Sequence, residues 1–281
     1  MKVLVTGANG QLGYDVVKEL QYRNIECYGA TRADFDLCDF AAAEKFITAY
    51  NPDVIIHCAA YTAVDKAEDE VELCRAVNAG GTENIAKICK TIDAKMLYIS
   101  TDYVFDGTKD GCYEVNDIPN PINVYGQTKF EGEQAVQKIL NKYFIVRISW
   151  VFGRHDNNFV KTMLRLGKER QEISVVADQI GSPTYTEDLA KLLIDMIQTD
   201  KYGIYHATNE GECSWAEFAE EIFKVAGMDV MVKHIAAEEY PTKAKRPKNS
   251  RMSKNKLVTG NFHKLPQWQD ALMAFIGNIN L

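Results

Sequence analysis

A tyrosine and a lysine four residues apart are the most chemically suggestive pair in this sequence of 281 residues. Tyr125 and Lys129 stand at the start of a stretch with helical spacing, where positions i and i+4 share one face. A nearby ammonium group favours the phenolate and so lowers the pKa of a tyrosine. Such a tyrosine can exchange a proton with a substrate oxygen at neutral pH. The same spacing also occurs by chance in helices that do no chemistry.

A threonine upstream adds a hydroxyl group to this pair. Thr101 follows Ser100 at the end of a predicted strand, and its hydroxyl could hold the same substrate oxygen. We therefore predict that Thr101, Tyr125 and Lys129 are the catalytic residues.

Three glycines, Gly7, Gly10 and Gly13, lie between the first predicted strand and the first predicted helix. Glycines in this context permit a tight turn and let backbone N–H groups at the helix N-terminus approach a pyrophosphate. The alternative is a glycine-rich turn without a ligand. Together with the tyrosine–lysine pair, the motif favours a bound dinucleotide.

The end of the second predicted strand bears on which dinucleotide is bound. It reads Thr31-Arg32, with no carboxylate before Asp34. An acidic residue at this place bonds a ribose 2′-hydroxyl, whereas an arginine accommodates a 2′-phosphate. We therefore predict that Thr31 and Arg32 contact NADPH, with NADH as the alternative. The alternative is that Arg32 is a surface residue whose side chain points into water.

The spacing of apolar residues predicts the elements that carry these groups. Short β-branched runs predict strands over 2–6, 25–30, 54–57, 96–100 and 143–148. Amphipathic stretches predict helices over 11–20, 41–50, 71–91 and 127–140. Strands that alternate with helices need crossover connections, which indicate a parallel sheet covered on both faces. The predicted fold class is α/β, a Rossmann-like doubly wound parallel sheet.

The pattern changes after Trp150. Helices are predicted over 158–170, 186–198 and 214–226, and Ser214 with Glu217 forms a capping box at the start of the last one. We predict a dinucleotide-binding domain over 1–150 and a smaller, mostly helical substrate lobe over 151–281, with some segments returning to the first domain.

Composition and charge exclude several classes of protein. The sequence is 46% hydrophobic with a net charge of −7, which is typical of a globular protein and makes a broad nucleic-acid-binding face unlikely. No apolar stretch approaches the ~20 residues that a membrane span needs, and the sequence starts without a signal-peptide pattern. Seven cysteines without C-x-x-C spacing fit neither a disulfide framework nor a zinc site, and we expect reduced core residues. These features predict a cytoplasmic protein without a metal, a membrane or a nucleic acid as partner.

The charge distribution has one local exception. Between residues 241 and 256 there are seven cations and no carboxylate. This run is either a solvated loop or a site for an anion.

Longer motifs indicate a family. The chain resembles the extended short-chain dehydrogenase/reductase superfamily, and more narrowly the dTDP-4-dehydrorhamnose reductases. The resemblance spans nearly the whole length through residues 6–13, 58–68, 100–107, 125–129, 147–150, 157–163 and 245–250. The glycine and Tyr-x-x-x-Lys motifs are common to the superfamily, whereas the others are specific to the narrower family.

The resemblance implies roles for individual residues. Tyr125 would be the proton donor, Lys129 would hold the nicotinamide ribose, and Thr101 would complete the triad. The remaining cofactor residues would be Gly7, Gly10, Gln11 and Leu12 at the pyrophosphate, Asp36 and Leu37 at the adenine, and Ala60, Tyr61 and Thr62 at the far side. The residues implied for the sugar nucleotide are Thr101, Asp102, Trp150, Asn158 and, at its diphosphate, Arg246.

The implied activity is reduction of the 4-keto group of dTDP-4-dehydro-6-deoxy-L-mannose, which gives dTDP-L-rhamnose. The alternatives are a non-catalytic dinucleotide-binding regulatory subunit, and a sugar-nucleotide epimerase or dehydratase. Some members of the family form dimers through magnesium held by carboxylates, but residues 268–281 contain only Asp270. We therefore expect no metal site, and a homodimer is left open.

Four other ring-bearing side chains invite simpler interpretations. We predict that His57, on a buried strand, is a core histidine and that Trp215 and Trp268 are packing residues. His155 lies in a polar loop, and contact with a substrate is the less favoured interpretation there.

Overall fold

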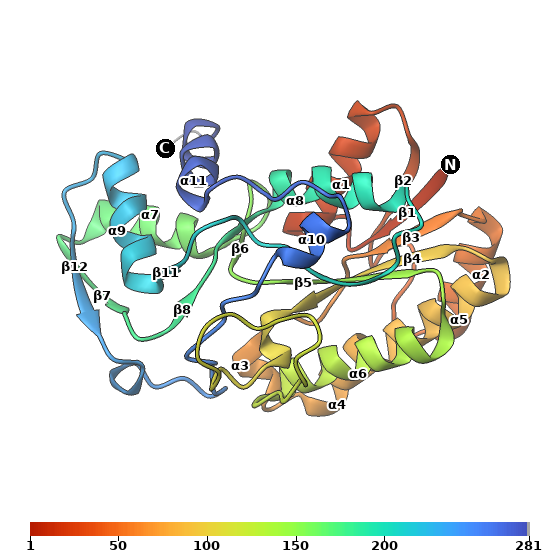
Figure 1. Ribbon diagram of the computed structural model, residues 1–281, viewed down its shortest axis with the longest axis horizontal. Helices are drawn as coiled ribbons and strands as arrows, with labels where there is room; N and C mark the ends of the chain where they lie inside the picture. Colours follow the sequence, from red (N-terminus) through yellow and green to blue (C-terminus); the bar gives the residue numbers. More distant parts are fainter. Residues whose placement is uncertain (280–281) are drawn as a thin grey trace.

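A six-stranded parallel sheet forms the centre of the computed structural model, which describes residues 1–279 (Figure 1). Its strands are β1 (Lys2–Thr6), β2 (Glu26–Ala30), β3 (Val54–His57), β4 (Lys95–Thr101), β5 (Tyr143–Ile148) and β10 (Gly203–His206). They lie in the order β10-β5-β4-β3-β1-β2, and every neighbouring pair is parallel. The predicted Rossmann-like doubly wound sheet is confirmed.

Helices cover both faces of this sheet. Helices α1 (Gln11–Tyr22) and α8 (Thr186–Ile197) pack together on one face, and α2 (Phe40–Tyr50), α5 (Thr82–Ile92) and α6 (Val124–Ile139) cover the other. Successive side chains of a strand point to opposite faces. Val3 and Val5 therefore enter the core beneath α1 and α8, whereas Leu4 enters the core beneath α2 and α5. A strand that is buried on both faces needs apolar residues at its odd and its even positions.

The strand order reverses beside β1. The chain passes from β1 to β2 on one side and then returns to β3 on the other side of β1. In open α/β sheets this reversal leaves a crevice beyond the carboxyl ends of the strands. The glycine turn after β1 and the loop 58–62 after β3 meet at this crevice.

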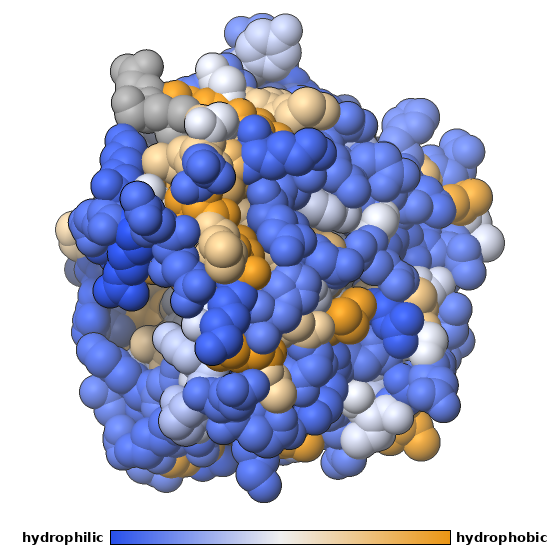
Figure 2. All heavy atoms as spheres, turned by 90° about the vertical axis from the view of Figure 1, so that its left-hand side faces the viewer, coloured by the Kyte–Doolittle hydropathy of each residue, from blue (hydrophilic) through white to orange (hydrophobic). Residues whose placement is uncertain are grey.

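The later part of the chain builds a second region with its own core (left in Figure 1). Its elements are β6 (Val151–Phe152), α7 (Phe159–Glu169), β7 (Glu172–Val176), β8 (Ile180–Gly181), β9 (Thr184–Tyr185), β11 (Cys213–Ser214), α9 (Trp215–Val225), β12 (Met231–Ile235) and α11 (Trp268–Gly277). The short strands pair as β6 with β9, β7 with β12, and β8 with β11. The outward face of this region is mostly hydrophilic, with separate hydrophobic spots (Figure 2). The division of the chain at residue 150 stays a prediction, since β10 and α8 follow it and pack in the central sheet region.

Short helical segments complete the fold. They are α3 (Val64–Ala67), α4 (Val71–Arg75), the π-helix η1 (Ala76–Gly81), the 3₁₀ segments η2 (Asp102–Val104) and η3 (Ala237–Glu239), and α10 (Asn255–Thr259). The predicted single helix over 71–91 is thus α4, η1 and α5, because a π turn inserts an extra residue. The predicted capping box of Ser214 and Glu217 is confirmed at α9. Over residues 1–279, every helix is too short or too polar to cross a membrane.

Candidate active site

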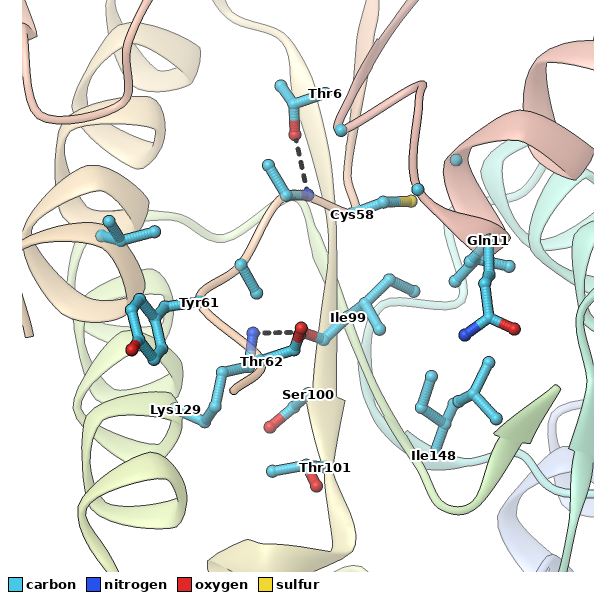
Figure 3. A pocket seen from close by; sticks show the side chains of 18 of the residues that line it. Thr6, Gln11, Cys58, Tyr61, Thr62, Ile99, Ser100, Thr101, Lys129 and Ile148 are labelled. Carbon is cyan, nitrogen blue, oxygen red and sulfur yellow. Dashed lines mark hydrogen bonds between the residues drawn. The ribbon is translucent and has the colours of Figure 1, made fainter. Parts of the chain in front are cut away.

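A cavity of about 700 Å³ opens at the carboxyl ends of β1 to β5 (Figure 3). Its volume is that of a site for a drug-sized or cofactor-sized ligand. Every predicted cofactor residue lines it, namely Gly7, Gly10, Gln11, Leu12, Thr31, Arg32, Asp36, Leu37, Ala60, Tyr61, Thr62, Tyr125 and Lys129. The predicted substrate residues Thr101, Asp102 and Trp150 line it as well. Their roles stay predictions, but the fold brings them to one place.

The glycine turn leaves the N-terminus of α1 open toward this cavity. Gly7 has φ +68°, and a Cβ there would lie 2.8 Å from the backbone of Ala59. A Cβ on Gly13 would lie 2.2 Å from the carbonyl oxygen of Gly7. Gly10 is the N-cap of α1 and has no side chain to cover the first N–H groups of the helix. These free N–H groups and the positive end of the helix dipole fit a dinucleotide pyrophosphate.

A serine in the cavity wall also fits a polar ligand. The hydroxyl of Ser100 is buried, lines the cavity and has no hydrogen-bond partner among residues 1–279. A buried hydroxyl without a partner is costly, so a ligand group that bonds it is favoured there.

Close packing of α6 against the end of β4 assembles the triad. Asn123 caps α6 by accepting a hydrogen bond from the N–H of Gly126 at 2.7 Å. A Cβ on Gly126 would lie 2.1 Å from the carbonyl oxygen of Tyr103, so only glycine allows this approach. Tyr125 and Thr101, which stand next to these contacts in the sequence, therefore line the same part of the cavity.

Lys129 is held by the strand rather than by the tyrosine. Its Nζ donates a hydrogen bond to the carbonyl oxygen of Ile99 at 2.7 Å (Figure 3). The same Nζ lies 4.1 Å from the ring centre of Tyr98. Burial lowers the pKa of Lys129 to about 7. The pKa of Tyr125 is raised, first by burial and then by the charge of Asp102. Burial and Asp102 are thus the largest influences on the pKa of Tyr125, and the lowering of this pKa by Lys129 together with a bound nicotinamide stays a prediction.

Asp102 is buried at the end of β4, with both carboxylate oxygens hydrogen-bonded. Thr101 Oγ1 donates to Oδ1 at 2.9 Å, and Ser250 Oγ donates to Oδ2 at 2.5 Å. Burial raises the pKa of Asp102 to about 6, although the two hydroxyl groups act in the opposite direction.

An aromatic pair forms the wall on the side of the second region. Trp150 lies in the left-handed region with φ +49° and stacks on Trp215 with ring centres 3.7 Å apart. A Cβ on Gly181 would lie 2.8 Å from the indole of Trp150, so glycine is required behind it. Trp215 also lines the cavity, which its interpretation as a packing residue missed. Trp268 is buried in the core of the second region, and its prediction as a packing residue is confirmed.

Two predicted substrate residues, both within residues 1–279, lie outside the cavity lining. Asn158 caps α7 and donates hydrogen bonds to Gln11 Oε1 at 3.0 Å and to the carbonyl oxygen of Gly153 at 2.8 Å. Arg246 donates to both carboxylate oxygens of Asp65, at 3.1 and 2.7 Å. Each side chain already forms hydrogen bonds with other residues of this chain.

The basic run is largely neutralised by carboxylates. Its ion pairs join Lys243 to Asp69, Arg246 to Asp65, Lys248 to Asp178 and Glu238, Arg251 to Glu212, and Lys254 to Glu210. The basic run, residues 241–256, therefore links several parts of the fold through ion pairs.

The end of β2 presents an exposed arginine beside the cavity. Asp34 accepts hydrogen bonds from the N–H of Thr31 at 2.8 Å and from its hydroxyl at 3.0 Å. Arg32 pairs with Asp36 at 2.7 Å, and its side chain is 82% exposed. An exposed ion pair of this kind contributes little stability, so Arg32 is free to exchange its partner for a phosphate.

Within residues 1–279, no histidine lines the cavity, and Cys58 is the one cysteine that does. His57 is buried between the hydroxyls of Thr6 and Thr82, at 2.7 and 3.2 Å, which confirms it as a core histidine. His155 stacks on Tyr14, with ring centres 4.6 Å apart. All seven cysteines are free, but only three are buried, so the prediction of core positions is wrong for the exposed Cys38.

Asn78 on the π-helix was not singled out in the sequence. Its side chain accepts a hydrogen bond from the N–H of Tyr61 at 2.8 Å and donates to the carbonyl oxygen of Tyr61 at 3.1 Å and to Thr128 at 3.2 Å. It thus fixes the cavity loop after β3 against α6. The only sequence signal is a pair of glycines shortly after it, Gly80 and Gly81, which follow Ala79.

Comparison with known proteins agrees with this geometry. The sequence profile described as RmlD substrate binding domain matches residues 1–281. The chain belongs to the RmlD family. This RmlD chain is 42% identical to the dTDP-4-dehydrorhamnose reductase of Aggregatibacter actinomycetemcomitans, over 96% of the chain and 97% of the relative. The predicted resemblance to the dTDP-4-dehydrorhamnose reductases is confirmed.

Solved structures give the same result. The RmlD chain superimposes on a crystal structure of dTDP-4-dehydrorhamnose reductase from Bacillus anthracis in complex with NADP, with a TM-score of 0.97, 47% identity, and coverage of 99% of this chain and 100% of the other. A dTDP-4-dehydrorhamnose reductase from Clostridium acetobutylicum has a TM-score of 0.96 and 43% identity, with 99% of both chains covered.

Carboxylates at the C-terminus of the RmlD chain were considered for a magnesium site. Asp270 lies on α11, and within residues 1–279 no group of three or more His, Cys, Asp and Glu side chains is placed to hold a metal ion. Residues 280 and 281, the end of the segment considered, lie outside the described residues.

Proposed function

We propose that this protein is an NADPH-dependent oxidoreductase that reduces the 4-keto group of dTDP-4-dehydro-6-deoxy-L-mannose to give dTDP-L-rhamnose. The observation that carries the proposal is one continuous cavity, which extends from the glycine turn at Gly7 to Thr101, Tyr125 and Trp150. Named reductases at 42% and 47% identity over nearly the full length support the reaction. The cofactor, when bound, supplies the hydride for carbon C4 of the sugar.

The first part of the cavity suits the cofactor. Backbone N–H groups at the N-terminus of α1 would hold the pyrophosphate, and Asp36 and Leu37 would border the adenine. Arg32 is exposed at the ribose end, where a guanidinium matches the geometry of a 2′-phosphate. The NADP in the Bacillus anthracis relative supports NADPH as the preferred cofactor, with NADH as the alternative.

The second part of the cavity carries the chemistry of the protein side chains. Tyr125, like any tyrosine of ordinary or raised pKa, is protonated at neutral pH, so it has a proton to give to the C4 oxygen. Protonation at this atom prevents a full negative charge from developing on the oxygen. Lys129 is fixed against β4 and would hold the nicotinamide ribose.

The sugar nucleotide would contact residues at the ends of β4 and β5. Asp102 and Trp150 line the cavity there and would contact the sugar. Asn158 and Arg246 remain predicted substrate residues, and each would first have to leave Gln11 or Asp65.

The test is incubation of the purified protein with the dTDP-ketosugar and NADPH, followed by identification of the sugar formed. One mole of NADPH consumed per mole of dTDP-L-rhamnose supports the proposal. Conversion of the ketosugar without net loss of NADPH would instead identify an epimerase or dehydratase. NADPH binding without conversion, together with stable co-purification of another enzyme, would identify a regulatory subunit.

Location and assembly follow as further proposals. Seven free cysteines among residues 1–279 are compatible with a reducing compartment, which supports the cytoplasm. A homodimer would be detected by light scattering on a sizing column.

A further inference from the structure

A serine of the basic run reaches the catalytic end of β4. Ser250 is 148 residues from Asp102 in the sequence, yet its hydroxyl lies 2.5 Å from Oδ2 of that carboxylate. Thr101 Oγ1 lies 2.9 Å from the other oxygen, Oδ1. The three side chains are buried, with exposed fractions of 4% for Ser250, 3% for Asp102 and 5% for Thr101. They form one chain of hydrogen bonds that ends at the cavity.

The charge of Asp102 determines the direction of these bonds. An ionised carboxylate only accepts hydrogen bonds, so both hydroxyl groups must donate their single protons to it. Thr101 Oγ1 also accepts a bond from the N–H of Tyr103 at 3.2 Å. With its proton and one lone pair engaged, the hydroxyl has only a second lone pair left for the cavity. It can accept a hydrogen bond from a phenol or an alcohol, and it cannot donate one to a ketone.

We propose that Ser250, acting through Asp102, fixes the Thr101 hydroxyl as a hydrogen-bond acceptor in the cavity and is therefore a positioning residue for the reduction. This inference rests on the proposed function. Thr101 would then orient the Tyr125 hydroxyl before the ketone binds, and the alcohol formed at C4 afterwards, by accepting a hydrogen bond from it.

The backbone holds Ser250 rigidly at this place. The N–H of Ser250 donates to the carbonyl oxygen of Ile180 at 2.7 Å. The neighbouring Asn249 donates through Nδ2 to the carbonyl oxygens of Lys109 and Gly111, at 2.7 and 2.8 Å. The backbone at Ser250 is thus tied to the second region and, through Asn249, to the loop after η2, which fixes its position beside Asp102.

Protonation of Asp102 would reverse the arrangement. The titratable groups around this carboxyl are Tyr103 on η2 and Tyr125 on α6, and the charges of Arg246 and Asp65 act on Tyr103 in turn. The hydrogen bond from Ser250 favours the ionised form and so lowers the pKa of Asp102 against the effect of burial. A neutral Asp102 has a proton to donate, which would free the Thr101 proton for the cavity.

The experiment compares Ser250→Ala with Ser253→Ala. Ser253 belongs to the same basic run and is also buried. Its hydroxyl accepts a hydrogen bond from the N–H of Asn255 at 3.4 Å instead of contacting Asp102. We expect Ser250→Ala to lower kcat roughly tenfold, with KM close to native, because Thr101 loses its fixed orientation. The acidic limb of the kcat–pH profile should move to higher pH. Ser253→Ala should match the native protein in all three quantities.

A second readout does not depend on turnover. Infrared titration follows the carboxylic acid band that disappears in Asp102→Asn, and its midpoint should rise in Ser250→Ala but not in Ser253→Ala. Equal midpoints in the two serine variants overturn the inference, even in a preparation that reduces no ketosugar. An active native enzyme whose Ser250→Ala variant keeps the native kcat and pH profile overturns it too, while the proposed function stands. If Ser250→Ala does not fold, Ser250→Cys fills the same space with a weaker donor, and the same two readouts apply to it.

Discussion

Tyr125 holds its proton firmly because the phenol is buried and lies near the charge of Asp102. For a reduction this is the useful protonation state, since the side chain has to deliver a proton to the substrate oxygen. Lys129, whose pKa burial lowers, is fixed by a carbonyl group of β4. At the scale of single residues, burial therefore has the largest influence on the pKa of both side chains.

Removal of the Tyr125 hydroxyl tests its role as the proton donor. We expect Tyr125→Phe to lower kcat about 10²-fold or more, because no other group protonates the C4 oxygen. Steady-state kinetics with NADPH and the ketosugar measure this. Tyr14→Phe, whose ring only stacks on His155, serves as the control. A Tyr125→Phe enzyme with native kcat would remove the phenol from the mechanism.

Arg32 tests the choice of cofactor. Its exposed guanidinium should bind the 2′-phosphate, so Arg32→Ala should raise KM for NADPH roughly tenfold and leave KM for NADH unchanged. The control is Arg165→Ala, an exposed arginine of α7 that pairs with Glu169. An equal rise of KM for both cofactors would mean that Arg32 does not distinguish NADPH from NADH through the 2′-phosphate.

The glycine turn shows what one element demands of its residues. Helix α1 starts so close to the turn that a Cβ on Gly13 would lie 2.2 Å from the carbonyl oxygen of Gly7. The oxygen cannot move away alone, because it belongs to the backbone of the turn. The same element provides the open N–H groups that would hold the pyrophosphate. The packing of α1 against the turn and the binding of the pyrophosphate thus both depend on glycines, which have no side chain.

Gly13→Ala tests this dependence. The methyl group should force α1 away from the turn, lower the free energy of unfolding by about 1–3 kcal/mol and weaken NADPH binding. Urea denaturation and NADPH fluorescence titration measure the two effects. Gly277→Ala, where a Cβ would meet nothing within 4 Å, should leave NADPH binding unchanged and should not lower the free energy of unfolding. Native stability and affinity in Gly13→Ala would contradict the prediction.

At the scale of the whole molecule, a buried ion pair links α6 to the sheet. Glu133 receives hydrogen bonds from Arg147 at 2.8 and 2.7 Å, and the side chains are 0% and 2% exposed. Glu133 lies one turn beyond Lys129 on α6, so the pair fixes the helix that carries the catalytic residues. A buried pair is costly to break, because the remaining charge has no partner.

Glu133→Gln should therefore lower the free energy of unfolding by about 3–5 kcal/mol. Glu83→Gln, which removes an exposed pair with Lys87, should change it by less than about 0.5 kcal/mol. Both values come from urea denaturation at neutral pH. Similar small losses in the two variants would show that the buried pair contributes little.

Two buried histidines should make the whole molecule sensitive to acid. Burial lowers the pKa of His57 and of His206 from 6.5 to about 3. Their neutral forms are favoured in the folded state, so their contribution to stability is present above pH 6.5 and is lost as the pH falls toward 3. The free energy of unfolding should be lower at pH 5 than at pH 7, and the drop should be smaller in His206→Asn. An unchanged drop in that variant would contradict the assignment.

The sequence alone determined the sheet, its helices and most of the cavity lining. Alternation in strands, helical spacing and the glycine and Tyr-x-x-x-Lys motifs are local signals, and residues that follow parallel strands gather at one edge of a sheet by topology. The tertiary structure decided which partner each side chain has. Arg246 on Asp65, Trp215 in the cavity wall and Ser250 on Asp102 are contacts across long stretches of chain. No periodicity encodes such contacts, because they depend on how the second region packs against the first. The raised pKa of Tyr125 was decided in the same way, since burial exists only once the chain has folded.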